Sequence, residues 1–266
     1  MIILVTGTSS GFGKAIKAEL ERRGHIVYGT SRRGSDNPAD RTLQLEVRNP
    51  ENCQQVVDYI VNRHGQLDVL INNAGFGLGG AVELTSPDDF RLQMDTNFFG
   101  CVNMCRAALP VMRAQRRGRI LNFSSIAGRF AIPFQGPYSC SKFAIEAFSE
   151  SLVLETAQFG IDVLCVEPGD FSTGFTAARL NSEASAADPD YSASYARVRK
   201  NYEDDETIRG AKPEYLARRV ARLVEAHRTS FHNVITPNPV QHLSVFLSRI
   251  VPTKLFLRII AKFYNV

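Results

Sequence analysis

The run Ile2-Ile3-Leu4-Val5, followed by Thr6-Gly7-Thr8-Ser9-Ser10-Gly11-Phe12-Gly13, decides the fold of this chain. The first four residues are continuously apolar, which is typical of a strand buried on both faces of a parallel sheet. Beyond Gly13, apolar residues recur at helical spacing as far as Gly24. A strand, a glycine-rich turn and a helix N-terminus in this order form an anion site, because backbone N–H groups and the helix dipole face the ligand. The segment therefore predicts a pyrophosphate-binding turn.

Further along the chain, apolar runs alternate with amphipathic stretches. This alternation predicts an α/β fold, in which one domain (residues 1–266) holds a Rossmann-type doubly wound parallel sheet with helices on both faces. Gly7, Asn73, Ser125 and Gly169 follow predicted strands, so we expect them to meet at the carboxyl edge of the sheet, where such folds bind ligands. Strands are predicted at residues 2–6, 25–30, 42–47, 67–72, 119–124, 161–166 and 231–236, and helices at 11–23, 50–64, 87–115, 137–159 and 213–227.

Tyr138, Lys142 and Ser125 form the leading candidate for a catalytic group. Pro137 favours a helix start, which places Tyr138 and Lys142 four residues apart on one helix face. A nearby ammonium stabilises a phenolate, so we expect the pKa of Tyr138 to fall from about 10 toward working pH, as a general acid/base requires. Ser125 follows an apolar run and can hydrogen-bond a carbonyl oxygen. Together the three side chains can protonate an alkoxide as hydride reaches its carbon, although a Tyr-x-x-x-Lys pair alone also occurs by chance.

These motifs, in this order, resemble the classical short-chain dehydrogenase/reductase family over residues 1 to about 175. Thr6 to Gly13 resembles the cofactor turn of the family, and Asn72-Asn73-Ala74-Gly75 resembles its sheet-stabilising motif. Asn97 matches its active-site asparagine, and Ser125 precedes Tyr138 by thirteen residues, the usual spacing of the family. Pro168-Gly169, with Thr173 four residues beyond Gly169, resembles the segment that contacts the nicotinamide carboxamide.

The resemblance implies roles for these residues. Tyr138 would exchange the proton, Ser125 would position the substrate oxygen, Lys142 would lower the pKa of Tyr138 and bind the nicotinamide ribose, and Asn97 would hold a water that links Lys142 to solvent. Asn97 is alternatively a helix residue bonded to backbone. The cofactor contacts expected are Gly7, Ser9, Ser10, Gly11, Phe12, Gly13, Ser31, Arg32, Glu46, Val47, Asn73, Ala74, Gly75, Tyr138, Lys142, Pro168, Gly169 and Thr173.

The end of the second predicted strand indicates which nicotinamide cofactor is used. NAD-preferring sites place an acidic residue here, on the ribose hydroxyls, whereas this chain has Ser31-Arg32-Arg33. A guanidinium binds a 2′-phosphate through two parallel hydrogen bonds, which a carboxylate would repel. We therefore predict NADP(H), bound mainly by Arg32 with help from Ser31. Glu46-Val47 stands where the family has Asp-Val near the adenine.

The overall composition is that of a globular protein. The chain has 266 residues, of which 44% are hydrophobic, and no run of eighteen apolar residues predicts a spanning helix. The first residues enter a strand without a signal-like segment, so we expect a cytoplasmic location. Five cysteines without metal-ligand spacing predict reduced, mostly buried thiols and no metal site. A net charge of +4 does not indicate nucleic-acid binding.

Several segments bear on the substrate. The stretch from Asn72 to Phe175 resembles the branch that holds 17β-hydroxysteroid and retinol dehydrogenases, which implies a hydrophobic carbonyl or alcohol. Phe130, Ile132, Pro133 and Phe134 either flank the pocket or pack within their loop. Residues 174–212 lack strong periodicity, and a long insertion beside a cofactor site is more often a substrate lid than a linker.

The C-terminal extension, residues 240–266, is apolar and basic. Lys254, Arg258 and Lys262 form one basic stripe on an otherwise apolar helix. Such a helix suits an anionic membrane surface, a cover over the substrate pocket or an oligomer interface, and the last two are favoured slightly. The resemblance also implies a homo-oligomer, a dimer or a tetramer.

Two rival functions follow from the same residues. One is an NADPH-binding regulatory or scaffold protein that has lost turnover, which the intact Asn97, Ser125, Tyr138 and Lys142 argue against. The other is an epimerase or dehydratase of nucleotide-sugars, whose members usually carry a larger substrate domain than this length allows.

Overall fold

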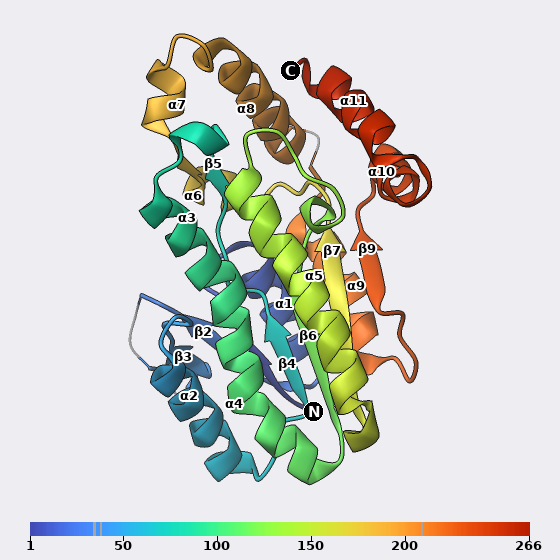
Figure 1. The fold of residues 1–266 in the computed structure, drawn as a ribbon. Coiled ribbons are helices and arrows are strands. Elements are labelled where there is room, and N and C mark those ends of the chain that lie inside the picture. Colours follow the sequence, from blue (N-terminus) through green and yellow to red (C-terminus); the bar gives the residue numbers. More distant parts are fainter. Residues whose placement is uncertain (34–35, 38, 209) are drawn as a thin grey trace.

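A seven-stranded parallel sheet forms the centre of the computed structural model, which describes residues 1–33, 36–37, 39–208 and 210–266 (Figure 1). The strand order is β3-β2-β1-β4-β6-β7-β9, so successive crossovers run outward in opposite directions from β1 and β4. This reversal is the topological switch point of a doubly wound fold, and the predicted fold class is confirmed. The strands are β1 (Ile2–Val5), β2 (Ile26–Ser31), β3 (Thr42–Gln44), β4 (Val69–Asn72), β6 (Gly118–Phe123), β7 (Ile161–Pro168) and β9 (His232–Ile235).

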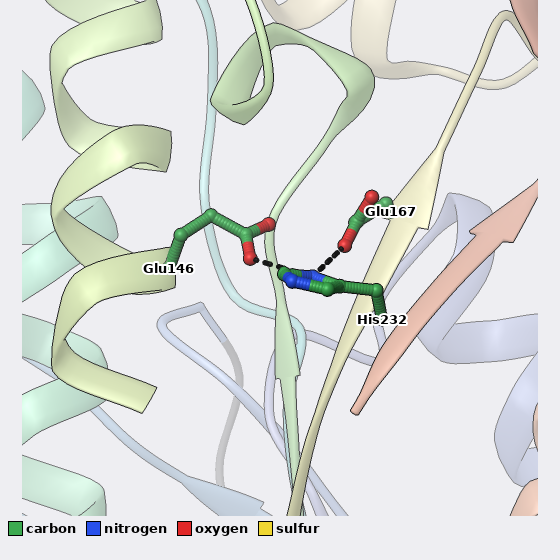
Figure 2. A group of neighbouring side chains, drawn as sticks. All are labelled: Glu146, Glu167 and His232. Carbon is green, nitrogen blue, oxygen red and sulfur yellow. Dashed lines mark hydrogen bonds and ion pairs between the residues drawn. The ribbon is translucent and has the colours of Figure 1, made fainter. Parts of the chain in front are cut away.

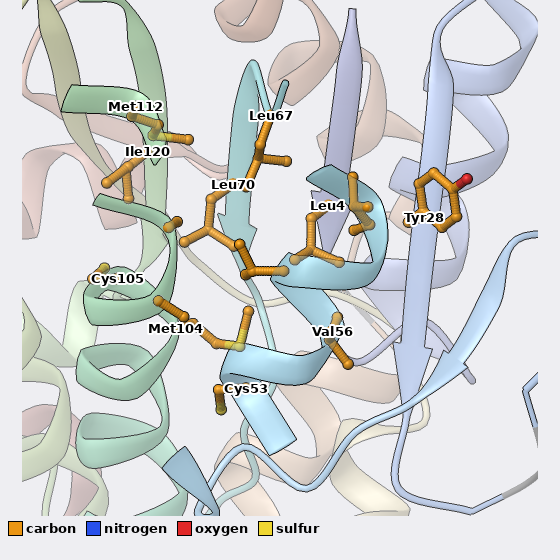
Figure 3. Packing of buried hydrophobic residues seen from close by; sticks show 14 of the residues in the cluster. Leu4, Tyr28, Cys53, Val56, Leu67, Leu70, Met104, Cys105, Met112 and Ile120 are labelled. Atoms are coloured by element: carbon orange, nitrogen blue, oxygen red, sulfur yellow. The ribbon is translucent and has the colours of Figure 1, made fainter. Parts of the chain in front are cut away.

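Helices cover both faces of this sheet. Successive strand residues point to opposite faces, so Leu4 packs in one core cluster and its neighbours Ile3 and Val5 in another. The first cluster lies under helices α2, α4 and α5, and the second under α1 and α9. Figure 3 shows Leu4 and Leu70 of the sheet packed beside Val56 of α2 and Met104 of α4. These helices are α1 (Gly11–Arg22), α2 (Pro50–His64), α4 (Gly100–Gln115), α5 (Gly136–Thr156) and α9 (Pro213–Glu225).

Two predicted elements differ in the structure. The single helix expected over 87–115 is divided into α3 (Pro87–Met94), a π-helical turn (Asp95–Phe99) and α4. π-Helical turns are frequent at functional sites, and this one carries Asn97. The strand expected over 42–47 ends at Gln44, because the Glu46 N–H bonds the Asn52 side chain at 2.8 Å rather than a neighbouring strand.

Residues 174–212 hold more regular structure than their sequence indicates. They form α6 (Phe175–Ala178), β8 (Leu180–Asn181), α7 (Glu183–Ala187) and α8 (Ser192–Thr207), and β8 pairs with β5 (Leu78–Gly79). The buried positions of α8 do follow a helical period, at Tyr195, Val198, Tyr202 and Glu206. The predicted pattern missed this helix because three of these four side chains carry polar atoms.

Two helices end the chain, α10 (Pro239–Ile250) and α11 (Thr253–Tyr264), and α11 contacts α8 at the carboxyl end of the sheet (Figure 1). Their buried residues join a third apolar cluster, in which the Phe256 ring lies 5.4 Å from the Phe130 ring. Three short 3₁₀ turns complete the structure, at Val82–Leu84, Ile126–Gly128 and Ala157–Phe159. Among the described residues, no helix has both the length and the apolar character needed to cross a bilayer.

Candidate active site

A cavity of about 1230 Å³ lies along the carboxyl edge of the sheet. Gly7, Asn73, Ser125 and Gly169, each of which follows a different strand, all line it. The structure also places most other expected cofactor and catalytic residues on its wall. They are Ser9, Ser10, Gly11, Phe12, Ser31, Arg32, Val47, Ala74, Gly75, Tyr138, Lys142, Pro168 and Thr173. Gly13, Glu46 and Asn97 do not line the cavity.

The glycine turn forms the floor of this cavity. Gly7 (φ +73°) and Gly11 (φ +53°) adopt left-handed conformations that favour glycine. Asn73 closes the turn, because its Nδ2 donates to the carbonyl oxygens of Thr6 (2.8 Å) and Gly7 (3.1 Å). Ser10 precedes α1 without a side-chain capping bond, so the first-turn N–H groups remain available to a ligand. This cradle fits the pyrophosphate of a nicotinamide dinucleotide.

Gly13 lets the glycine turn and the start of α1 pack closely together. A Cβ atom at this position would stand 2.2 Å from the Gly7 carbonyl oxygen. The absence of a side chain therefore lets α1 begin directly against the turn, and a contact between Gly13 and the cofactor stays a prediction.

Tyr138, Ser125 and Lys142 come together at the middle of the cavity, and all three are buried. Tyr138 and Lys142 lie on the first turns of α5, and Ser125 follows β6. The Ser125 hydroxyl accepts a hydrogen bond from the Ala127 N–H at 3.1 Å, which holds its side chain at the start of the 3₁₀ turn. Lys142 Nζ donates to the Phe123 carbonyl at 2.8 Å and lies 5.5 Å from the centre of the Tyr138 ring.

The pKa expected for Tyr138 is wrong, because it rises rather than falls. Burial raises the pKa of Tyr138 to about 12, while a hydrogen bond with Ser125 opposes this rise. Burial also lowers the pKa of Lys142 to about 8, since the ammonium loses hydration. Desolvation therefore outweighs the attraction between ammonium and phenolate that the sequence spacing predicts.

Asn97 holds the loop that follows β4. Its Oδ1 accepts from the Phe76 N–H at 3.0 Å, and its Nδ2 donates to the Phe76 carbonyl at 3.0 Å and to Ser141 Oγ at 3.1 Å. These bonds correspond to the alternative of an asparagine bonded to backbone. They also tie the π-helical turn to α5, one residue before Lys142. Its water-binding role stays a prediction.

The far end of the cavity is basic. Arg32 and Arg33 line it and are exposed, and Ser31 Oγ donates to the Arg33 carbonyl at 2.6 Å. Glu46 instead forms an ion pair with Arg48 at 2.9 Å, outside the cavity lining. The carboxylate of Glu46 is thus held by a neighbour in sequence, and a contact between Glu46 and the cofactor stays a prediction.

The comparisons with known proteins agree with this geometry. The profile of the family described as "short chain dehydrogenase" matches residues 1–184. The chain belongs to the short-chain dehydrogenase family. It is thus an oxidoreductase of the kind that binds a nicotinamide cofactor.

Among the relatives of this dehydrogenase is 3-ketodihydrosphingosine reductase of Bacteroides thetaiotaomicron, which is 48% identical over 89% of the chain and 88% of the relative. Retinol dehydrogenase 8 of Bos taurus is 36% identical over 70% of the chain and 64% of the relative. The crystal structure of a short-chain dehydrogenase from Streptomyces avermitilis covers 94% of both chains, with 33% identity and a TM-score of 0.82.

Sequence reasoning missed much of the wall above Tyr138. Asp170 lies directly after the Pro168-Gly169 motif, whereas Arg179, Asp205 and Glu206 come from the segment that covers the cavity. Residues of α10 and α11 complete this wall, among them Leu243, Leu247, Ile259 and Phe263. Of these wall residues, Asp170 alone has a sequence signal, which is its position beside a cofactor motif. The others have none, because contacts between distant segments leave no local pattern.

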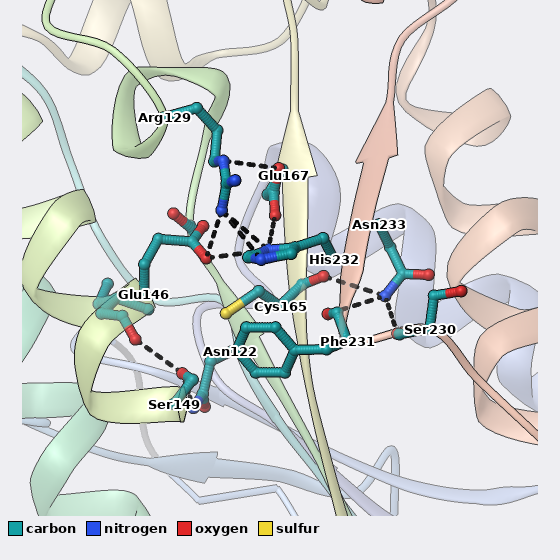
Figure 4. Close-up of polar contacts among 12 residues, drawn as sticks. Asn122, Arg129, Glu146, Ser149, Cys165, Glu167, Ser230, Phe231, His232 and Asn233 are labelled. Carbon is teal, nitrogen blue, oxygen red and sulfur yellow. Dashed lines mark hydrogen bonds and ion pairs between the residues drawn. The ribbon is translucent and has the colours of Figure 1, made fainter. Parts of the chain in front are cut away.

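A second polar cluster lies outside the lining of this cavity. Figure 2 shows Glu146 of α5 and Glu167 of β7 on either side of His232 of β9. His232 Nδ1 lies 2.7 Å from Glu167 Oε1 and 3.4 Å from Glu146 Oε2. The Arg129 guanidinium lies 3.7 Å from Glu146 and 3.9 Å from Glu167 and provides the compensating positive charge (Figure 4).

Burial dominates the titration of this cluster. It raises the pKa of Glu167 to about 8, with Glu146 adding to the rise. It lowers the pKa of His232 to about 4, with Arg129 adding to the fall. Because the cluster joins α5 to β7 and β9, we expect its protonation to affect the stability of the fold.

Proposed function

We propose that this dehydrogenase uses NADPH to reduce the ketone of a long-chain lipid, as in 3-ketodihydrosphingosine. The observation that carries the proposal is one continuous cavity, which extends from the glycine turn past Tyr138 to an apolar mouth on α10 and α11. A volume of about 1230 Å³ exceeds the range of a typical small-ligand site and suits a dinucleotide together with an elongated substrate. The 48% identity to a reductase of that lipid supports the same substrate class.

The proposed chemistry follows from the three residues at the centre of the cavity. When bound, NADPH would supply the hydride for the carbonyl carbon. Ser125 donates a hydrogen bond to the carbonyl oxygen, and Tyr138 gives its proton to that oxygen. Lys142, fixed by the Phe123 carbonyl, places a positive charge beside the Tyr138 ring and favours the tyrosinate that remains.

The choice of NADP(H) rests on Arg32. Arg32 lines the cavity, whereas the carboxylate of Glu46, which lies outside the lining, forms an ion pair with Arg48. A 2′-phosphate at this end would gain a bidentate, charge-assisted contact. We accordingly propose that the dehydrogenase prefers NADPH to NADH.

The outer surface of α10 and α11 supports a further part of the proposal, contact with an anionic membrane. Val240, Leu243, Ile259 and Phe263 line the cavity and are also exposed, so the mouth opens between apolar side chains. The exposed basic stripe of Lys254, Arg258 and Lys262 runs beside it. Apolar side chains beside basic ones match the surface of an anionic bilayer, from which a lipid substrate would enter. The homo-oligomer stays a prediction from the family.

Initial rates of NADPH and NADH oxidation, over long-chain keto-lipid, steroid, retinoid and small polar carbonyls, test the proposed reaction. We expect turnover of the long-chain ketone with NADPH to exceed that of the polar carbonyls. NADPH binding without turnover of any carbonyl would instead favour the non-catalytic protein considered from the sequence.

Flotation with phosphatidylserine and phosphatidylcholine vesicles tests the membrane contact. The wild-type chain should float with the anionic vesicles, and reversal of the basic stripe (K254E/R258E/K262E) should abolish this flotation. Equal flotation of the wild type and this variant would remove the membrane contact. The matched control reverses three exposed arginines on other elements, Arg63, Arg218 and Arg222.

A further inference from the structure

Charged side chains form one wall of the cavity above Tyr138. Asp170 follows β7, Arg179 follows α6, and Asp205 and Glu206 lie on α8. None of them is needed for hydride transfer or for the pyrophosphate. An apolar ketone pocket gains nothing from buried charges, which are costly to desolvate. Their presence therefore indicates a polar group on the substrate.

Arg179 is the most confined member of this wall. Its residue is 6% exposed, and its guanidinium stacks 4.2 Å from the centre of the Tyr202 ring and 5.4 Å from that of the Phe175 ring. Nη2 donates to Glu206 Oε1, while Nε and Nη1 are buried without a hydrogen-bond partner. A buried donor without a partner costs free energy. These two donors can therefore bind an acceptor on a ligand inside the cavity.

The carboxyl groups outnumber this guanidinium. Among the described residues that line this end of the cavity, Asp170, Asp205 and Glu206 face one cationic side chain, Arg179. The Gln241 amide donates to Asp170 Oδ2 and Thr176 Oγ1 donates to Glu206 Oε2, which fixes both carboxylates. Burial raises the pKa of Asp170 to about 7, and repulsion from the negative charges of Glu206 and Asp205 adds to this rise. Added positive charge would relieve this repulsion.

The wall lies close to the reacting atoms. The Phe175 ring lies 5.8 Å from the Tyr138 ring, and the Arg179 guanidinium also packs against the Phe175 ring. The charges of the wall also act on the pKa of Tyr138, which Arg179 lowers and Glu206 and Asp170 raise. A ketone held by Tyr138 and Ser125 would thus place substituents on its neighbouring carbons against the wall.

We propose that this wall is a head-group subsite that binds a primary ammonium on the carbon next to the ketone, with Asp170 as its acceptor and Arg179 donating to an adjacent hydroxyl oxygen. The inference rests on the proposed function and deepens it. The alkyl chain then runs the other way, toward the apolar mouth on α10 and α11. The dehydrogenase would select an amino ketone over a plain long-chain ketone.

The test compares kcat/KM for a long-chain 2-amino-1-hydroxy-3-ketone with that for the same ketone lacking the amine. The wild type should prefer the amino ketone, and Asp170→Asn should reduce this preference about ten- to hundredfold, as expected for a lost charged hydrogen bond. Asp190→Asn, an exposed residue before α8, is the matched control and should keep the preference. An equal preference in Asp170→Asn and wild type would overturn the subsite.

A second measurement needs no variant. A saturated long-chain amine should inhibit the wild type more strongly than the alcohol of equal length, and equal inhibition by the two would also overturn the subsite. The two proposals fail separately. Turnover of the plain ketone without amine preference would leave the reductase intact and remove the subsite, whereas no turnover of either ketone would contradict the reductase itself.

Discussion

Substitution of Gly13 by alanine should disrupt the cofactor turn through packing alone. The added Cβ would stand 2.2 Å from the Gly7 carbonyl oxygen and 2.7 Å from Asn73 Nδ2, although real Cβ atoms essentially never come within 3.0 Å of a neighbour. Asn73 cannot move aside freely, because the same amide group holds the carbonyls of Thr6 and Gly7. The start of α1 must therefore shift relative to β1.

The size of the effect follows from this overlap. Overpacking by one methyl group costs about 1–3 kcal/mol, which for a chain of this length lowers Tm by about 2–12 °C. The shift also displaces the first-turn N–H groups, and loss of one charge-assisted bond to the pyrophosphate weakens NADPH binding about tenfold or more.

Two assays measure these effects, thermal unfolding without cofactor and calorimetric titration with NADPH. Gly174→Ala is the control for Tm, since its Cβ would meet no atom within 4 Å and its φ of −66° suits alanine. Its Tm should stay close to that of the wild type. A Gly13→Ala variant with wild-type Tm and wild-type affinity for NADPH would refute the packing argument.

Three further predictions concern the cofactor, the acid and the buried cluster. Arg32→Gln should weaken NADPH binding about ten- to hundredfold and leave NADH binding unaffected, whereas Arg22→Gln should change neither; an equal loss for both cofactors would contradict the 2′-phosphate contact. Tyr138→Phe should lower kcat by about a hundredfold or more with NADPH affinity retained, and near-normal turnover would remove Tyr138 as the acid. Glu167, with its pKa raised to about 8, stabilises the fold fully below its usual pKa of about 4.5 and loses this contribution as pH rises through about 8. His232, with its pKa lowered to about 4, contributes fully to the stability of the fold above about pH 6.5. This contribution is lost as pH falls through about 4. Glu167→Gln should therefore flatten the decline of Tm between about pH 5 and pH 8, and an unchanged decline would count against the burial of its charge.

Local sequence accounts for most of the fold and for the position of the candidate site. The apolar run Ile2–Val5 and the glycines after it specify a strand, a turn and a helix start, because backbone conformation and strand burial depend on adjacent residues. The spacing of Tyr138 and Lys142 on one helix turn is equally local. The alternation of strands and helices then places Gly7, Asn73, Ser125 and Gly169 at one edge of the sheet.

Tertiary structure alone decided what surrounds these residues. The pKa of Tyr138 rises rather than falls, because burial acts through the whole surrounding fold and not through the lysine four residues away. Glu146, Glu167 and His232 meet although 65 residues separate the last two. Arg179 and Glu206 likewise pair across a segment with no repeating apolar pattern. Such contacts depend on how distant segments pack, which spacing along the chain does not encode.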